Sequence, residues 1–167
     1  MASTRVEPIT REDETALAQV RALFAEYAEW LSPFVTASTI AEELESLPAP
    51  FEEPGGRLLV AREADGGVCG CVGIKRHSET ACEIKRLFVR PDCRGTGIGY
   101  ALFSAALDAA CSLCYEEVLV STIPAYMEEA NRMYERLGFE STECFEERTQ
   151  AEVEIRYLRY DLDGWCV

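Results

Sequence analysis

A polar, glycine-rich turn, residues 94–99, has the sequence Arg94-Gly-Thr-Gly-Ile-Gly99 and lies between an expected strand and an expected helix. The first N–H groups of a helix have no partner within the helix, and the helix dipole adds partial positive charge there. Glycines keep side chains away from a bound phosphate, and Arg94 adds a permanent cation. We therefore expect a pyrophosphate group to be held by Arg94, Gly95, Thr96, Gly97, Ile98 and Gly99.

The spacing of these glycines excludes two common phosphate-binding motifs. A Walker loop requires Gly-x-x-x-x-Gly-Lys-Ser/Thr, and no lysine follows Gly99. A Rossmann fingerprint requires Gly-x-Gly-x-x-Gly, but a start at Gly95 puts Tyr100 at the third glycine position. A start at Gly97 puts Leu102 there. On the glycines alone, an ordinary tight turn without a ligand stays open as an alternative.

The eight cysteines and the single histidine do not suggest a metal centre. Cys69 and Cys71 alternate along an expected strand. Cys111 and Cys114 fall inside an expected helix, so neither pair lies on a tight ligand-bearing turn. We expect free thiols rather than disulfides, no bound metal, and a surface position for His77.

Hydrophobic spacing and turn residues predict the elements that position the glycine-rich turn. Strands are expected at 5–9, 57–63, 68–76, 81–89, 117–122, 139–145 and 152–161, and helices at 10–31, 39–47, 98–114 and 124–137. Pro8 suits an edge strand, and Ala64-Asp-Gly-Gly67 is typical of a hairpin turn. Thr10 and Thr39 are expected helix N-caps.

The last expected helix starts at Pro124. Its inward residues are expected to be Tyr126, Ala130, Met133 and Leu137. An antiparallel run of strands thus precedes two strand–helix units. The predicted fold class is α/β, in an α+β arrangement with a mixed, mostly antiparallel sheet of about seven strands and about four helices.

Size and charge narrow the function classes. The 167 residues suffice for one domain with a core, and no repeat interrupts them, so a single domain over 1–167 is expected. The net charge of −14 argues against nucleic acid or an anionic membrane as the main partner. No apolar run approaches the roughly 18 residues of a membrane span, and charge throughout the first twenty residues argues against a signal peptide. We expect a cytoplasmic protein.

Three segments carry a further signal: Glu83-Ile-Lys-Arg-Leu-Phe-Val89, the glycine-rich turn, and Met133-Tyr-Glu-Arg-Leu-Gly-Phe139. Together they resemble the GNAT superfamily of acetyl-CoA-dependent N-acetyltransferases, in its bacterial single-domain form. The phosphate motif of that family, Gln/Arg-x-x-Gly-x-Gly/Ala, is filled by Arg94, Gly97 and Gly99. The resemblance runs from about residue 57 to residue 139, and the remainder fits in element order only.

The resemblance implies a GNAT-like fold with acetyl-CoA as co-substrate. The backbone of Leu87, Phe88 and Val89 would bind the pantetheine arm as a neighbouring strand does. Strand 81–89 would splay from strand 117–122 to admit it, and the glycine-rich turn would hold the pyrophosphate. A backbone N–H near Val89 would stabilise the oxyanion of the tetrahedral intermediate.

An amine acceptor must lose a proton before it attacks the acetyl group. A lysine-like amine has a pKa of about 10.4, so its neutral form costs about 4.6 kcal/mol at pH 7. Glu83 lies six residues before Val89, where some members of the resembled family carry a catalytic glutamate, and is the candidate base. Alternatively, Glu83 only pairs with Lys85 or Arg76. Strand alternation predicts that one face holds Glu83, Lys85, Leu87 and Val89.

The leaving thiolate of CoA needs a proton in return. Tyr134 matches the tyrosine of the resembled family that approaches the CoA sulfur. A phenol with a pKa of about 10 can donate to a thiolate whose pKa is about 8.5. Alternatively, Tyr134 is only a core aromatic. Many family members carry a cofactor-binding Asn seven residues earlier, but that position is Met127 here, and Asn131 lies one helical turn away.

These residues predict an N-acetyltransferase that moves an acetyl group to a primary amine, on a small molecule or a peptide, by direct attack in a ternary complex. Acidic segments 42–45, 52–53 and 140–147 favour a cationic acceptor. The alternative is a non-catalytic acyl-CoA sensor or regulatory module. The sequence names neither the acceptor nor the oligomeric state, monomer or homodimer.

Overall fold

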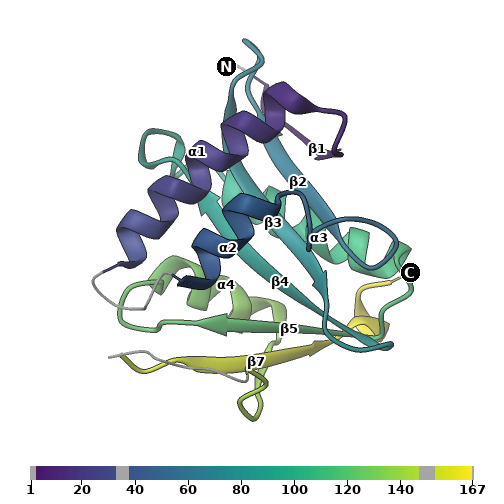
Figure 1. Cartoon of the computed structure of the whole chain (residues 1–167). Coiled ribbons are helices and arrows are strands. Elements are labelled where there is room, and N and C mark those ends of the chain that lie inside the picture. Colours follow the sequence, from purple (N-terminus) through teal and green to yellow (C-terminus); the bar gives the residue numbers. More distant parts are fainter. Residues whose placement is uncertain (1–2, 33–37, 147–152, 167) are drawn as a thin grey trace.

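The computed structural model describes residues 3–32, 38–146 and 153–166 of the chain. Seven strands form one sheet in the order β1-β2-β3-β4-β5-β7-β6, and helices cover both faces (Figure 1). The strands are β1 (Arg5–Ile9), β2 (Arg57–Arg62), β3 (Val68–Arg76), β4 (Ala81–Val89), β5 (Glu117–Thr122), β6 (Glu140–Ser141) and β7 (Arg156–Asp161). The helices are α1 (Glu14–Leu31), α2 (Ser38–Ser46), α3 (Ile98–Ser112) and α4 (Glu128–Leu137).

The sheet is mixed, as the sequence predicts. Within the described ranges, every neighbouring pair of strands is antiparallel except β4 and β5, which run parallel. β1 lies at one edge and pairs only with β2, and a short hairpin joins β2 to β3. The predicted edge strand and the predicted hairpin are both confirmed.

Two hydrophobic cores form, one on each face of the sheet. Leu23 and Phe24 of α1 pack with Val60 and Phe88 on one face. Leu102 and Phe103 of α3 pack on the other face, where Tyr134 of α4 joins them. The helices thus hold the central strands between two apolar layers. None of the helices in the described ranges is long and apolar enough to cross a membrane.

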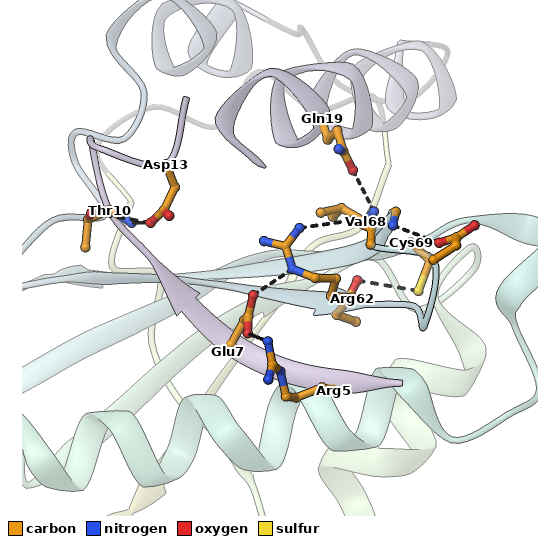
Figure 2. A network of polar contacts seen from close by, with 12 residues as sticks. Arg5, Glu7, Thr10, Asp13, Gln19, Arg62, Val68 and Cys69 are labelled. Atoms are coloured by element: carbon orange, nitrogen blue, oxygen red, sulfur yellow. Dashed lines mark hydrogen bonds and ion pairs between the residues drawn. The ribbon is translucent and has the colours of Figure 1, made fainter. Parts of the chain in front are cut away.

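Polar contacts fasten β1 and α1 to the hairpin end of the sheet (Figure 2). The Arg62 guanidinium donates to the Glu7 carboxylate at 2.6 Å and to the Gly66 carbonyl at 3.0 Å. The Val68 N–H donates to the side-chain oxygen of Gln19 at 2.6 Å. These bonds connect the start of β3 to β2, β1 and α1.

The helix starts differ from the sequence predictions. Asp13, not Thr10, is the N-cap of α1, and its carboxylate accepts from the Thr10 N–H at 2.8 Å. α4 begins at Glu128 rather than Pro124, because the N–H groups of Tyr126 and Met127 both donate to the Ile123 carbonyl in a preceding turn.

The later start removes one predicted inward residue, because Tyr126 is 44% exposed. Ala130, Met133 and Leu137 pack against the α3-side core as predicted, and the buried residues of α4 are Asn131 and Tyr134. The predicted last two strands are also too long, because β6 and β7 are shorter than 139–145 and 152–161. α2 begins one residue before the predicted cap Thr39.

The expectation that all cysteines are free is wrong for one pair. Cys111 and Cys166 form a disulfide with their Cα atoms 5.7 Å apart, which ties α3 to the C-terminal segment. The partners are 55 residues apart, so no local spacing indicated the bond. Cys114 also lies outside the helix, because α3 ends at Ser112.

Candidate active site

A cavity of about 1530 Å³ opens where β4 and β5 part. The two strands pair only at Ala81–Glu117, Cys82–Val118 and Glu83–Leu119. Beyond Glu83 they diverge, so the predicted splay between 81–89 and 117–122 is confirmed. After Glu83, the edge of β4 that faces β5 is not paired with that strand.

A β-bulge at Arg86 reverses the alternation of β4. Gly73 pairs with Lys85 and Cys71 pairs with Phe88, so Val72 faces two residues of β4. Arg86 has a φ of 60°, in the left-handed region. The register of β4 therefore shifts by one residue within the strand.

The bulge overturns the prediction that Glu83, Lys85, Leu87 and Val89 share one face. Ile84 and Val89 pack in the α3-side core, with Leu87 against it, whereas Phe88 packs in the α1-side core. Odd-numbered residues before the bulge and after it thus face opposite sides of the sheet. Glu83 lies across the sheet from Ile84 and hence on the α1 side.

The end of β4 directs one backbone N–H into the gap. The Arg90 N–H donates to the Cys69 carbonyl of β3 at 2.9 Å. Because N–H groups alternate sides along an antiparallel strand, the Val89 N–H points away from β3 and toward the open side. Leu87, Phe88 and Val89 all line the cavity.

The glycine-rich turn closes one end of the same cavity. Gly95 and Gly97 have φ values of +78° and +83°, which side chains with a Cβ rarely adopt, and Gly97 is the N-cap of α3. The first N–H groups of α3 therefore face the cavity without a partner in the helix. Within 94–99, only Thr96 does not line the cavity, since its hydroxyl donates to the Cys93 carbonyl at 2.7 Å.

Arg94 folds back over the end of β4. Its Nε donates to the Val89 carbonyl at 2.8 Å, and its guanidinium lies 5.5 Å from the centroid of the Phe88 ring. This hydrogen bond takes up the Val89 carbonyl and does not involve the N–H of the same residue. Arg94 thereby connects the glycine-rich turn to the splayed strand.

Glu83 is 7% exposed and lines the cavity beside two basic groups. The Lys85 Nζ lies 4.0 Å and the His77 Nδ1 3.9 Å from its carboxylate oxygens. Burial and the neighbouring Arg86 cation lower the pKa of Lys85. Both contacts are at the outer limit of an ion pair, so the carboxylate lies near the Lys85 ammonium and the His77 ring without a tight bond to either.

Tyr134 is 6% exposed and also lines the cavity. Its ring lies 5.2 Å from Phe103 and 5.4 Å from Phe139, centroid to centroid. Burial, with a smaller effect from Tyr27, raises the pKa of its phenol well above the usual value, so it stays protonated at neutral pH. Tyr134 is thus both a core aromatic and a cavity residue.

An ion pair that sequence reasoning missed holds α2 over the bulge. The Arg86 guanidinium donates to both carboxylate oxygens of Glu43, at 2.7 and 3.0 Å, with side-chain exposures of 11% and 7%. Burial opposes the charge on Arg86, but the hydrogen bonds and charge of Glu43 raise its pKa. The two residues are 43 positions apart, so no local pattern signals the pair.

Several carboxylates of the acidic segments already pair with arginines and are less available to a substrate than the sequence suggests. Glu43 is committed to Arg86, Glu52 pairs with Arg11, and Glu53 pairs with Arg57. The cavity lining also carries cations, among them Lys75, Lys85, Arg86, Arg94 and Arg136. Glu42 and Glu146 of these segments also line the cavity, so a cationic acceptor stays a prediction.

Met127, which occupies the family's asparagine position, lines the cavity and joins β5 to α4. Its sulfur accepts from the Thr122 hydroxyl at 3.5 Å and from the Ile123 N–H at 3.4 Å. Asn131 does not line the cavity; its amide donates to Thr122 and to the Met127 carbonyl, and its buried Oδ1 has no partner in the described part of the chain.

Comparisons with known proteins agree with one another. Residues 54–141 match a family model described as the acetyltransferase (GNAT) domain, over more than half of the chain. An uncharacterized N-acetyltransferase of Schizosaccharomyces pombe is 31% identical, over 74% of this chain and 76% of its own length. An uncharacterized N-acetyltransferase of Escherichia coli (strain K12) is 31% identical, over 90% of this chain and 91% of its own.

A solved structure shows the same fold. It is a protein of Salmonella typhimurium, described as a putative acetyltransferase, with its cofactor acetyl-CoA. It superimposes with a TM-score of 0.74 at 17% identity, over 98% of this chain and 96% of that one.

The buried ion pair gives a testable prediction. We expect Glu43→Gln to lower the free energy of unfolding by about 3–5 kcal/mol, because Arg86 is left as an uncompensated buried charge. Chemical denaturation measures the loss. Glu53→Gln, which breaks the exposed pair with Arg57, is the control and should change little. Equal, small losses in both variants would show that the Glu43 pair is not buried in solution.

Proposed function

The chain belongs to the GNAT family of acetyltransferases, and from this we propose that it moves the acetyl group of acetyl-CoA to a primary amine by direct attack in a ternary complex. One observation carries the proposal. Glu83 of β4 and Tyr134 of α4 line the same cavity as the glycine-rich turn. A base, an acid and an anion-binding turn are thus available to one reacting centre.

The residues present fit acetyl-CoA, which supplies the acetyl thioester. The partnerless N–H groups at the start of α3 suit a pyrophosphate, and the positive φ values of Gly95 and Gly97 keep the backbone open to it. Arg94 lies beside the turn with guanidinium N–H groups to spare after its bond to Val89. In this proposal these groups bind the pyrophosphate, Thr96 through its backbone only.

The unpaired edge of β4 suits the rest of the co-substrate. A pantetheine arm contains amides that can pair with the backbone of Leu87 and Val89, as a neighbouring strand does, whereas the backbone groups of Phe88 between them face β3. The Val89 N–H, directed into the gap, is the group that we assign to the developing oxyanion. A preorganised donor there stabilises the charge of the tetrahedral intermediate more than that of the starting thioester.

We assign proton removal from the amine to Glu83, directly or through water. Its carboxylate lies in the cavity without a tight ion pair, so it can accept a hydrogen bond from a substrate ammonium. We assign to Tyr134 a hydrogen bond from its phenol to the leaving thiolate. Burial raises the pKa of the phenol, so it keeps its proton while the thiolate forms, and the released thiolate takes its own proton from water.

Binding and turnover test the proposed function together. We expect acetyl-CoA to raise the thermal unfolding temperature, with a stabilisation of about 2.7 kcal/mol at a hundredfold excess over its Kd. A panel of primary amines should then release free CoA thiol in the same mixture. Absence of stabilisation would contradict the assignment of the glycine-rich turn. Stabilisation without thiol release from any amine would favour an acyl-CoA sensor.

Tyr134→Phe separates catalysis from binding. Loss of the phenolic proton should lower kcat by about a hundredfold or more and leave the Kd of acetyl-CoA nearly unchanged. Thiol-release kinetics and calorimetry measure the two quantities. The control is Tyr160→Phe, whose ring stacks on Phe139 and does not line the cavity. Unchanged kcat in Tyr134→Phe would remove the phenol from the mechanism.

Glu83→Gln should show a characteristic pH dependence. We expect kcat/KM to fall by about a hundredfold at pH 7, because the amine is almost fully protonated there. The difference from wild type should shrink as the pH approaches the pKa of the amine, where no base is needed. Glu79→Gln, an exposed carboxylate outside the cavity, is the control. A deficit that is constant with pH would argue against a base role.

A further inference from the structure

Three metal-ligating side chains converge beside the glycine-rich turn, outside the cavity's reacting end. The ligand atoms of Glu63, Cys69 and Cys93 all lie within 4.8 Å of one another. We propose that this cluster, two thiols and a carboxylate, binds one thiophilic divalent cation, and that Zn²⁺ is the ion its donor set favours.

The distances suit a tetrahedral ion. Zinc bonds of about 2.3 Å to sulfur and about 2.0–2.2 Å to oxygen place ligand atoms about 3.3–3.8 Å apart. The Cys93 sulfur already lies 3.9 Å from a Glu63 carboxylate oxygen and 3.8 Å from a carboxylate oxygen of Asp92. Closure around an ion therefore needs side-chain shifts of about 1 Å or less, and Asp92 or a water completes the fourth position.

The backbone holds the three ligands in place. Glu63 follows β2, and its N–H donates to the Gly67 carbonyl at 2.8 Å across the hairpin. Cys69 lies near the start of β3, where its sulfur is directed toward the Ala61 carbonyl of β2, at 3.6 Å (Figure 2). The Cys69 carbonyl accepts from the Arg90 N–H, and Cys93 lies in the turn that follows.

The sequence places Cys69 beside Cys71 and gives no indication of a metal centre. Cys69 and Cys71 alternate along β3, so Cys71 faces the α1-side core and its sulfur lies 3.6 Å from the Arg86 carbonyl. Cys69 faces the other side, together with Cys93. The site is assembled from two turns and the start of a strand, which is why no Cys-x-x-Cys spacing marks it.

The negative charge of the three ligands favours a divalent cation. A bound Zn²⁺ replaces two thiol protons, which leave to solvent, and it neutralises two of the three negative charges on two thiolates and Glu63. Thiolates select zinc over Mg²⁺ or Ca²⁺.

The position of the site connects it to the co-substrate end of the cavity. The Cys93 carbonyl accepts the Thr96 hydroxyl within the glycine-rich turn, and Cys93 itself reaches the cavity wall. A cation bound to Cys93 would anchor the turn to β2 and β3. Its ligands are nevertheless distinct from Glu83 and Tyr134, so the inference does not depend on the proposed acetyl transfer.

Metal titration tests the inference in a variant that lacks the exposed thiols, Cys114→Ala/Cys144→Ala. When the protein competes with a chromophoric chelator for Zn²⁺, it should bind one equivalent of Zn²⁺ per chain. Cd²⁺ as a probe should give the ultraviolet absorption of a cadmium–thiolate bond. The Kd should fall as the pH rises, toward about a hundredfold per pH unit when two protons are released. No binding, or binding without thiolate absorption, would overturn the proposal.

Variants of the ligands locate the site. In the same background, Cys93→Ala should abolish the cadmium–thiolate band of a two-sulfur site, and Glu63→Gln should weaken zinc binding by about tenfold or more. Asp65→Asn, in the same hairpin but outside the cluster, is the matched control and should bind as the parent does. Circular dichroism confirms folding of each variant. Binding that survives Cys93→Ala unchanged would overturn the proposal.

Discussion

The candidate active site depends on the point at which strands β4 and β5 stop pairing. β4 and β5 share only three residue pairs, the last at Glu83 and Leu119, and the rest of the β4 edge toward β5 has no strand beside it. Backbone N–H and carbonyl groups away from water need partners, so such an edge is costly unless something supplies them. Arg94 supplies one partner, for the Val89 carbonyl. The remaining groups are open to a ligand with amides of its own, and the two cores on either face hold the strands apart.

The bulge at Arg86 converts this opening into an asymmetric site. Without it, Glu83 and Val89 would face the same side of the sheet. With it, the carboxylate lies on the α1 side while Leu87 and Val89 pack on the α3 side. A left-handed φ at a non-glycine residue is unfavourable, and the bidentate bond to Glu43 gives Arg86 a fixed partner in that conformation. α2 is thereby positioned by the same residue that reverses the strand.

Sequence reasoning succeeded where local chemistry determines the structure. Hydrophobic alternation with flanking turn residues predicted β1 and the β2–β3 hairpin, and the glycines of residues 94–99 predicted a turn at the start of α3. It failed where distant residues decide. Nothing local to Arg86 marks a bulge, because its partner is Glu43, and the disulfide of Cys111 closes a span of 55 residues. The start of α4 was missed because Pro124 enters a separate turn before the helix.

The cavity connects the two faces of the sheet, and this bears on the order of the proposed chemistry. Its walls include Tyr27 and Phe88 from the α1-side core and Ile98 and Tyr134 from the α3-side core. Glu83 lies on the first side, while the glycine-rich turn and Tyr134 belong to the second. An amine beside Glu83 and a thioester beside Tyr134 would therefore meet across the gap between β4 and β5, each without displacing the other. That arrangement favours direct attack within a ternary complex over a route in which the two substrates occupy one position in turn.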